Sequence, residues 1–184
     1  MKKISLLFLF INSSLVISQT YFNNVKVNTD VTTKQYKDSR KFFYGELIPE
    51  EYKNLLLKLE TELNTKFTDD KAILINFEQA AYNCGYLNYS KNFLKKFHDN
   101  SVSISKNICQ NKNAVDFFIY DANSFLKKYA EKNKNFKQDS GFFATKIFTL
   151  KESCQAFFLL KPNGKFLICY GTDSLSYASN YLDE

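Results

Sequence analysis

The feature that most limits the possible folds of this chain is the apolar run Ala72–Phe77 (AILINF). A strand with one face in water alternates polar and apolar residues, whereas a strand covered on both faces reads as an unbroken apolar run. The run therefore predicts a central strand of a sheet with material on both sides. A loop of small and polar residues follows and ends at Cys84, where we expect the chain to turn into a helix.

Helices are predicted before and after this strand. Pro49 suits the first position of a helix, and the acidic residues Glu50 and Glu51 favour its positive end. Apolar residues then recur at helical spacing, which predicts a helix over Pro49–Asn64. The same spacing predicts further helices over Tyr86–Phe97, from an N-cap at Asp121 to about Lys132, and at the C-terminus after a cap at Thr172 or Asp173.

Three further segments are typical of strands. Val115–Tyr120 is a second buried-type run, and Ala156–Leu160 and Lys165–Tyr170 flank the turn sequence Lys-Pro-Asn-Gly, a strong hairpin signal. Lys41–Ile48 is expected as an edge strand or a packed lead-in. Strands that alternate with helices predict an α/β fold, and the terminal hairpin makes its sheet mixed rather than purely parallel.

The remaining segments are harder to assign. Gln19–Arg40 is polar and is expected to be an extension with little structure, apart from a short strand at Val25–Val27. Asp99–Asn113 is polar, with a short helical insert expected at Ile104–Cys109. Glu131–Ser140 is expected as a loop, and Gly141–Thr149 as a strand or a packed loop. The domain organisation expected is an extension at 19–40 followed by one domain at 41–184.

The N-terminus has the pattern of a secretory signal peptide over Met1–Ser18. Lys2 and Lys3 provide the positive start, Ile4–Ile11 the apolar core, and cleavage is expected ahead of Gln19. The apolar run is shorter than the ~20 residues that a membrane span needs, so a membrane anchor is disfavoured and no span is expected in the mature chain. We therefore expect an exported protein, periplasmic or secreted, whose cysteines meet an oxidising compartment.

Charge and motifs exclude several functions. The formal charge of +6 falls to about +4 without Lys2 and Lys3, and the lysines are scattered, which does not indicate nucleic-acid binding. No spacing of Cys or His indicates a metal site, and no glycine-rich phosphate loop or serine nucleophile elbow is present. We expect no cofactor, and the sequence does not indicate an oligomeric state.

Three stretches together resemble the thioredoxin-like superfamily, and exported TlpA/ResA-type thiol–disulfide oxidoreductases in particular. LINF before a loop and a cysteine resembles the strand and active-site turn. VDFFIYDANSFLKKYAEK resembles the third strand and helix, and QAFFLLKPNGKFLICYG resembles the terminal strand pair. The resemblance covers about Leu47 to the end. It implies a thioredoxin-like mixed sheet with helices on both faces and a C-terminal β-hairpin plus helix.

The chain departs from that family at its active site. The family carries two cysteines separated by two residues, of which the first attacks a substrate disulfide and the second resolves the mixed disulfide. Cys84 matches the first position, but Leu87 stands at the second, so Cys84-Gly85-Tyr86-Leu87 is a degenerate form of the motif. Gln155 is nearest to the place of the family's cis-proline. A peroxiredoxin needs a Thr and a Pro at fixed positions before its cysteine, and Ala81 and Phe77 stand there instead, which argues against peroxide reduction.

Four cysteines allow three sets of two disulfides, and the sequence alone does not choose among them. The resemblance implies that Cys84 and Cys154 lie at the same end of the sheet, so we expect them to form a disulfide or a reversible pair. A structural disulfide, a redox-active pair and a lone Cys84 thiolate at a helix start all stay open. Cys109 and Cys169 are expected as buried thiols or as a second bridge.

Other ionisable residues are given ordinary roles. His98, the single histidine, is expected at the surface, and Asp121 as a helix cap rather than a catalytic acid. Glu78 follows the central strand, where it is expected as a solvated loop carboxylate, with a proton acceptor for the cysteine turn as the alternative.

Two functions follow from the sequence. One is a thioredoxin-like module without standard dithiol activity, which would bind an extended peptide or an exported protein through the cysteine turn and the loop before the hairpin. The other is a thiol–disulfide oxidoreductase with Cys84 as nucleophile and Cys154 as a non-standard resolving cysteine.

Overall fold

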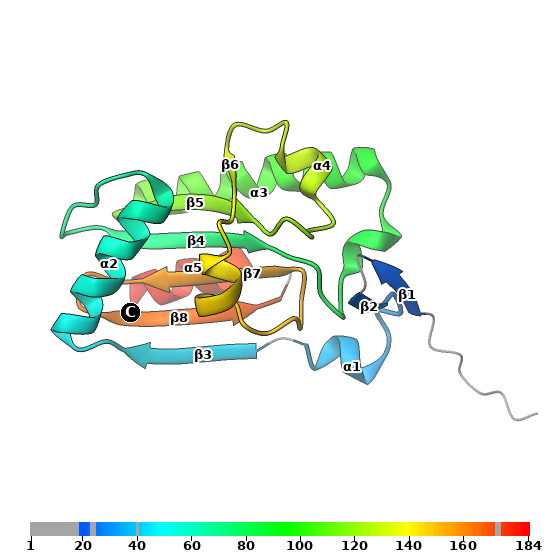
Figure 1. The fold of residues 1–184 in the computed structure, drawn as a ribbon, viewed down its shortest axis with the longest axis horizontal. Helices are drawn as coiled ribbons and strands as arrows, with labels where there is room; N and C mark the ends of the chain where they lie inside the picture. The colour runs from blue at the N-terminus through cyan, green and yellow to red at the C-terminus, as the bar shows by residue number, and fades with distance from the viewer. Residues whose placement is uncertain (1–18, 23–24, 40, 172–173) are drawn as a thin grey trace, which may run out of the picture.

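The computed structural model describes residues 19–22, 25–39, 41–171 and 174–184 as an α/β structure built on one mixed six-stranded sheet (Figure 1). This confirms the predicted fold class. The expected signal peptide at Met1–Ser18 and the expected cap at Thr172 or Asp173 lie outside the described residues. No helix in the described part of the chain has the length and apolar character of a membrane span.

The strand order of the sheet is β3-β8-β7-β4-β5-β6. The apolar run forms the central strand β4 (Ala72–Glu78), which pairs parallel with β5 (Ala114–Tyr120) and antiparallel with β7 (Gln155–Leu160). β7 and β8 (Lys165–Tyr170) form the predicted hairpin, and β3 (Lys41–Glu46) forms the predicted edge. The carboxyl end of β4 and the start of β7 therefore lie side by side.

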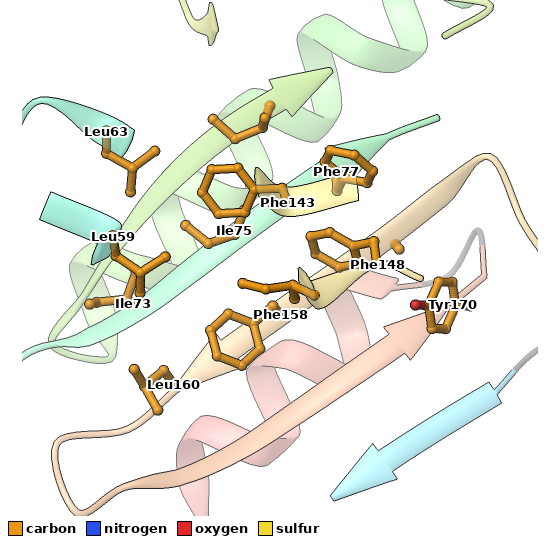
Figure 2. Close-up of a cluster of buried hydrophobic side chains, with 13 residues drawn as sticks. Leu59, Leu63, Ile73, Ile75, Phe77, Phe143, Phe148, Phe158, Leu160 and Tyr170 are labelled. Atoms are coloured by element: carbon orange, nitrogen blue, oxygen red, sulfur yellow. The ribbon is translucent and has the colours of Figure 1, made fainter. Parts of the chain in front are cut away.

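Helix α2 (Pro49–Leu63) and the π-helical turn η2 (Phe143–Ile147) cover one face of the sheet. Figure 2 shows Leu59 and Leu63 from α2 packed over Ile73 and Ile75 of β4 in the main hydrophobic core. Phe77 stacks on Phe148 with ring centroids 4.4 Å apart. Residues 141–149 thus form a packed helical turn, and the alternative prediction of a strand there is wrong.

Helices α3 (Lys91–Asn111) and α5 (Ser174–Asp183) cover the opposite face, where Figure 1 places α5 behind the sheet and α2 in front of it. Their core contains Leu74 from β4, Phe157 from β7 and Ala178 from α5, all buried. Helices on both faces and a hairpin followed by a helix are therefore confirmed. A side chain at position 74, 76 or 78 of β4 faces α3 and α5 because successive strand residues alternate between faces.

The helix predicted over Tyr86–Phe97 is wrong in its boundaries. Residues Gly85–Asn88 form a single 3₁₀ turn, η1, and Ser90 caps a new helix by accepting a hydrogen bond from the Phe93 backbone amide. A serine side chain that bonds backbone amides is favoured at a helix N-cap rather than in a helix interior. Helix α3 then continues to Asn111, so the short helical insert expected within 99–113 is part of this one long helix.

The N-terminal extension is more structured than predicted. β1 (Gln19–Phe22) and β2 (Val25–Asn28) form a separate two-stranded sheet, and α1 (Lys34–Lys37) follows. The short strand at Val25–Val27 is confirmed.

The helix predicted from Asp121 to Lys132 is wrong in its length, because only α4 (Lys127–Ala130) is helical there. The segment expected as a loop contains the strand β6 (Phe136–Gln138). Asp121 accepts a hydrogen bond from the Asn123 amide and so closes a short turn instead of capping a helix.

Candidate functional site

Cys84 and Cys154 form a disulfide at the end of the sheet where β4 ends and β7 begins. Their Cα atoms are 5.1 Å apart, and the preceding residues Asn83 and Ser153 form a parallel β-bridge. The pairing predicted for these two cysteines is confirmed. Cys109 and Cys169 are buried thiols, on α3 and β8.

Cys84 lacks the setting that activates a thioredoxin-type cysteine. Its backbone is extended, and it precedes a 3₁₀ turn of four residues, whereas the long helix α3 begins only at Lys91. A helix macrodipole acts within the first turn of a helix, so α3 does not stabilise a thiolate at position 84. The alternative of a lone Cys84 thiolate at a helix start therefore has no long helix to support it.

The N-terminal segment covers the disulfide. Val27 of β2 is 1% exposed and belongs to the same apolar cluster as Cys84 and Cys154, which are 3% and 0% exposed. The Asn28 backbone amide donates to the Tyr82 carbonyl, and the Asn88 side chain donates to the Thr29 carbonyl at 2.8 Å. Figure 1 shows β2 beside the chain that leaves β4. The described residues therefore shield both cysteines from solvent.

A carboxyl group and an imidazole lie buried beside the disulfide. Glu78, the last residue of β4, is 6% exposed, and its Oε1 accepts hydrogen bonds from the Tyr86 hydroxyl at 3.2 Å and from the Gln155 amide at 3.1 Å. His98 of α3 is 1% exposed and its Nδ1 is 3.6 Å from the same Oε1. The predictions of a solvated Glu78 and a surface His98 are both wrong.

Burial keeps this pair neutral. Loss of water raises the pKa of the Glu78 carboxyl to about 8 and lowers the pKa of the His98 imidazole to about 4. At pH 7 the Glu78 carboxyl is therefore protonated and the His98 imidazole is neutral, so the pair carries no net charge. The sequence contained one signal for His98: Leu94, His98 and Val102 are spaced four residues apart, and all three are buried on α3.

Two cavities flank the disulfide region. One of about 350 Å³ lies between the N-terminal segment, at Tyr36 and Ser39, and the bridge residues Asn83 and Ser153. The other, of about 290 Å³, lies against α3 and α5, and Glu78, His98 and Gln155 are part of its wall.

Several buried polar atoms at these cavities have no hydrogen-bond partner among the described residues. They are both side-chain atoms of Asn83, Oε2 of Glu78, Nε2 of His98 and Oε1 of Gln155. An unsatisfied buried polar group costs about 1–3 kcal/mol, so each of these atoms calls for a partner such as ordered water, an ion or a bound group.

No three His, Cys, Asp or Glu side chains in the described ranges gather as metal ligands would. Asp121 faces Lys151 Nζ at 3.5 Å rather than the disulfide. The site can thus bind polar groups and hold a proton, and it contains one covalent bond that exchange chemistry could open. No family model, curated protein or solved structure matches the chain.

Proposed function

We propose that this chain is an exported, thioredoxin-like protein that lacks standard dithiol oxidoreductase activity and acts as a binding or accessory module for an extended peptide. The helix–strand order and the position of the cysteine turn support the thioredoxin-like assignment. The burial of both sulfurs and the leucine at position 87 support the absence of ordinary dithiol turnover, because exchange requires an accessible thiolate.

The observation that carries the binding role is the Asn83 side chain. It is 2% exposed, it is part of the wall of the 350 Å³ cavity, and neither its amide nitrogen nor its amide oxygen has a hydrogen-bond partner among the described residues. A carboxamide with a donor and an acceptor available matches the C=O and N–H groups of a peptide backbone. An extended peptide is therefore the ligand whose chemistry fits this cavity best.

Gln79 provides the contrast that makes Asn83 unusual. It is a buried carboxamide five residues from Cys84 whose nitrogen donates to the Leu150 and Ser153 carbonyls at 2.8 and 2.9 Å, and its oxygen accepts from Lys151 at 2.9 Å. Both side-chain polar atoms of Gln79 thus have hydrogen-bond partners inside the fold, whereas those of Asn83 are available to an external partner.

The test compares Asn83→Leu with Gln79→Leu. A library of unstructured peptides of random sequence is passed over the immobilised mature protein, and the peptides that bind are enriched. The affinity of one enriched peptide is then measured by titration calorimetry. We expect Asn83→Leu to weaken binding at least about tenfold while leaving thermal stability equal or higher, because it removes an unsatisfied polar group. Gln79→Leu should instead lower stability, since it strands two backbone carbonyls.

The peptide-binding role fails if no peptide is enriched above a control surface, or if Asn83→Leu binds an enriched peptide as well as the unaltered chain does. A loss of stability in Asn83→Leu equal to that in Gln79→Leu would give Asn83 a structural role instead.

The thiol–disulfide oxidoreductase remains the second candidate, and Glu78 is the observation that favours it. A neutral carboxyl hydrogen-bonded to Tyr86, two residues after Cys84, is placed to donate a proton near the cysteine turn, where a cysteine thiolate leaves when the disulfide is opened. In that function an external dithiol would first reduce the disulfide to two thiols. Cys84 would then attack a substrate disulfide, and Cys154 would attack the mixed disulfide to release the reduced substrate and restore the Cys84–Cys154 bond.

A further inference from the structure

The cavity of about 290 Å³ on the α3 and α5 face is distinct from the peptide cavity at Asn83 and shares no wall residue with it. Its walls are of two kinds. Aromatic rings come from three elements, with Phe97 on α3, Phe118 on β5 and Phe136 on β6. Buried polar groups come from Glu78, His98 and Gln155, each more than nine-tenths buried, and the wall also contains the less buried polar residues Asn76, Ser101 and Ser176.

The hydrogen bonds inside the wall assign a donor and an acceptor to the cavity. Glu78 Oε1 already accepts from the Tyr86 hydroxyl and the Gln155 amide, so the proton of the neutral carboxyl belongs on Oε2, which becomes a donor. Gln155 uses its nitrogen on Glu78, and its Oε1 is an acceptor without a partner in the described structure. Glu78 and Gln155 are thus joined by a hydrogen bond, and together they present one donor (Glu78 Oε2) and one acceptor (Gln155 Oε1).

These features select a chemical class of ligand. A carboxamide carries an acceptor oxygen and a donor nitrogen on the same carbon, which is the complement of the Glu78 and Gln155 pair. The aromatic walls favour an apolar and flat body, and a cavity at the lower end of the usual range of ligand sites limits its size. A charged ligand is disfavoured, because the burial that keeps Glu78 and His98 neutral opposes any other charge there.

We propose that this cavity binds a small uncharged molecule that carries a carboxamide group on an aromatic or otherwise apolar body. The carboxamide oxygen accepts from Glu78, and its N–H donates to Gln155. His98 Nε2, which also lacks a partner in the described structure, is the third polar contact available to such a ligand. The inference goes beyond the proposed peptide-binding function and does not depend on it.

The experiment titrates the ¹⁵N-labelled full mature chain with benzamide, and with benzoate as a charged probe of the same shape. We expect benzamide to bind with a Kd on the order of 1 mM or tighter and to shift the amide signals around residues 78, 98 and 155. Benzoate should produce at least about tenfold weaker shifts at the same concentration. Because these measurements use the unaltered protein, they do not depend on how a variant folds.

Variants then locate the contacts. Gln155→Met removes the acceptor at nearly constant size and should weaken benzamide binding at least about tenfold. Glu78→Gln, which keeps an N–H donor, should retain binding within about threefold, whereas Glu78→Met should lose it. Asn83→Leu should leave benzamide binding unchanged, so a failure of the peptide-binding function can be recognised separately.

Three results would overturn the inference. One is the absence of benzamide shifts up to about 10 mM, well above the expected Kd. Another is equal binding of benzoate and benzamide. The third is a crystal grown with benzamide in which ordered water alone satisfies Glu78 Oε2 and Gln155 Oε1.

Discussion

At the scale of single residues, the surroundings of Cys84 and Cys154 resist exchange chemistry. An attacking thiolate must reach a sulfur atom, and Val27 with the rest of its apolar cluster encloses both sulfurs. The bond also closes a loop, since the two cysteines are 70 residues apart. In the chain-entropy model such a loop contributes about 4 kcal/mol to the free energy of unfolding. Burial and loop size together favour a structural disulfide.

We therefore predict that the Cys84–Cys154 bond stays oxidised in glutathione buffers, with a reduction potential below about −300 mV. Alkylation of the oxidised protein should leave Cys109 and Cys169 unlabelled in the native state and label both after unfolding. Their burial is the reason, and burial raises the pKa of the Cys109 thiol to about 12. Mass mapping of the alkylated peptides measures all four cysteines at once.

Cys84→Ser is the control for this experiment, because it should add Cys154 as a third thiol that is labelled after unfolding. Insulin reduction by the unaltered protein at ordinary thioredoxin rates, abolished by Cys84→Ser, would establish the oxidoreductase instead of the binding module.

At the scale of elements, the hairpin turn between β7 and β8 depends on Gly164. Its φ of +84° lies in a region that other L-residues rarely adopt, and its carbonyl accepts a hydrogen bond from the Leu47 amide at 3.0 Å. A Cβ atom at this position would lie 2.7 Å from the Leu47 carbonyl oxygen. The turn thus joins the hairpin to the segment that connects β3 to α2.

Gly164→Ala and Gly141→Ala form a matched pair of variants. Comparing them distinguishes the cost of backbone strain from the cost of a steric clash with the new Cβ atom. Gly141 has a φ of +103°, but a Cβ there would meet no atom within 4 Å. We predict that Gly141→Ala lowers the free energy of unfolding by about 1–2 kcal/mol through strain alone. Gly164→Ala should lower it further, since the Leu47 carbonyl must also move. Urea denaturation measures both, and equal losses in the two variants would contradict the predicted collision.

The elements that the sequence predicts correctly are those with strong local signals. The apolar run of β4, the amphipathic helix α2 and the Pro-Asn-Gly hairpin carry their structure in a few adjacent residues. β6 could not be predicted, because three residues of mixed polarity become a strand only by pairing with β5. The length of α3 was missed because its buried stripe includes the polar residues His98 and Ser105.

Parts of the candidate site could likewise be predicted from the sequence, and other parts could not. The resemblance to a known fold was enough to predict that Cys84 meets Cys154. The Glu78, His98 and Gln155 cluster was missed because its members come from β4, α3 and β7, and only the packing of three elements removes them from water. The cover formed by Val27 was missed because its strand lies in a polar extension with little sign of a core.

At the scale of the whole molecule, the buried pair Glu78 and His98 couples folding to pH. Glu78 has an ordinary pKa of 4.5 and a folded pKa of about 8, so the folded chain binds the extra proton between these values and loses stability as pH rises through them. His98 has an ordinary pKa of 6.5 and a folded pKa of about 4, so the unfolded chain binds the extra proton there and stability rises with pH. The two effects cancel between pH 4.5 and 6.5, and only the loss caused by Glu78 remains from pH 6.5 to 8.

We predict that, relative to Glu78→Gln, which cannot titrate, the free energy of unfolding falls by about 1 kcal/mol per pH unit between pH 4.5 and 8, because the effect of His98 is common to both proteins. Urea denaturation of both proteins across pH 4 to 9 gives the difference curve, in which titrating groups common to both proteins cancel. The curve should level off above pH 8, where Glu78 is ionised in folded and unfolded chains alike. A difference that stays constant through this interval would mean that Glu78 is already ionised at pH 6.5, as a carboxylate paired with a protonated His98.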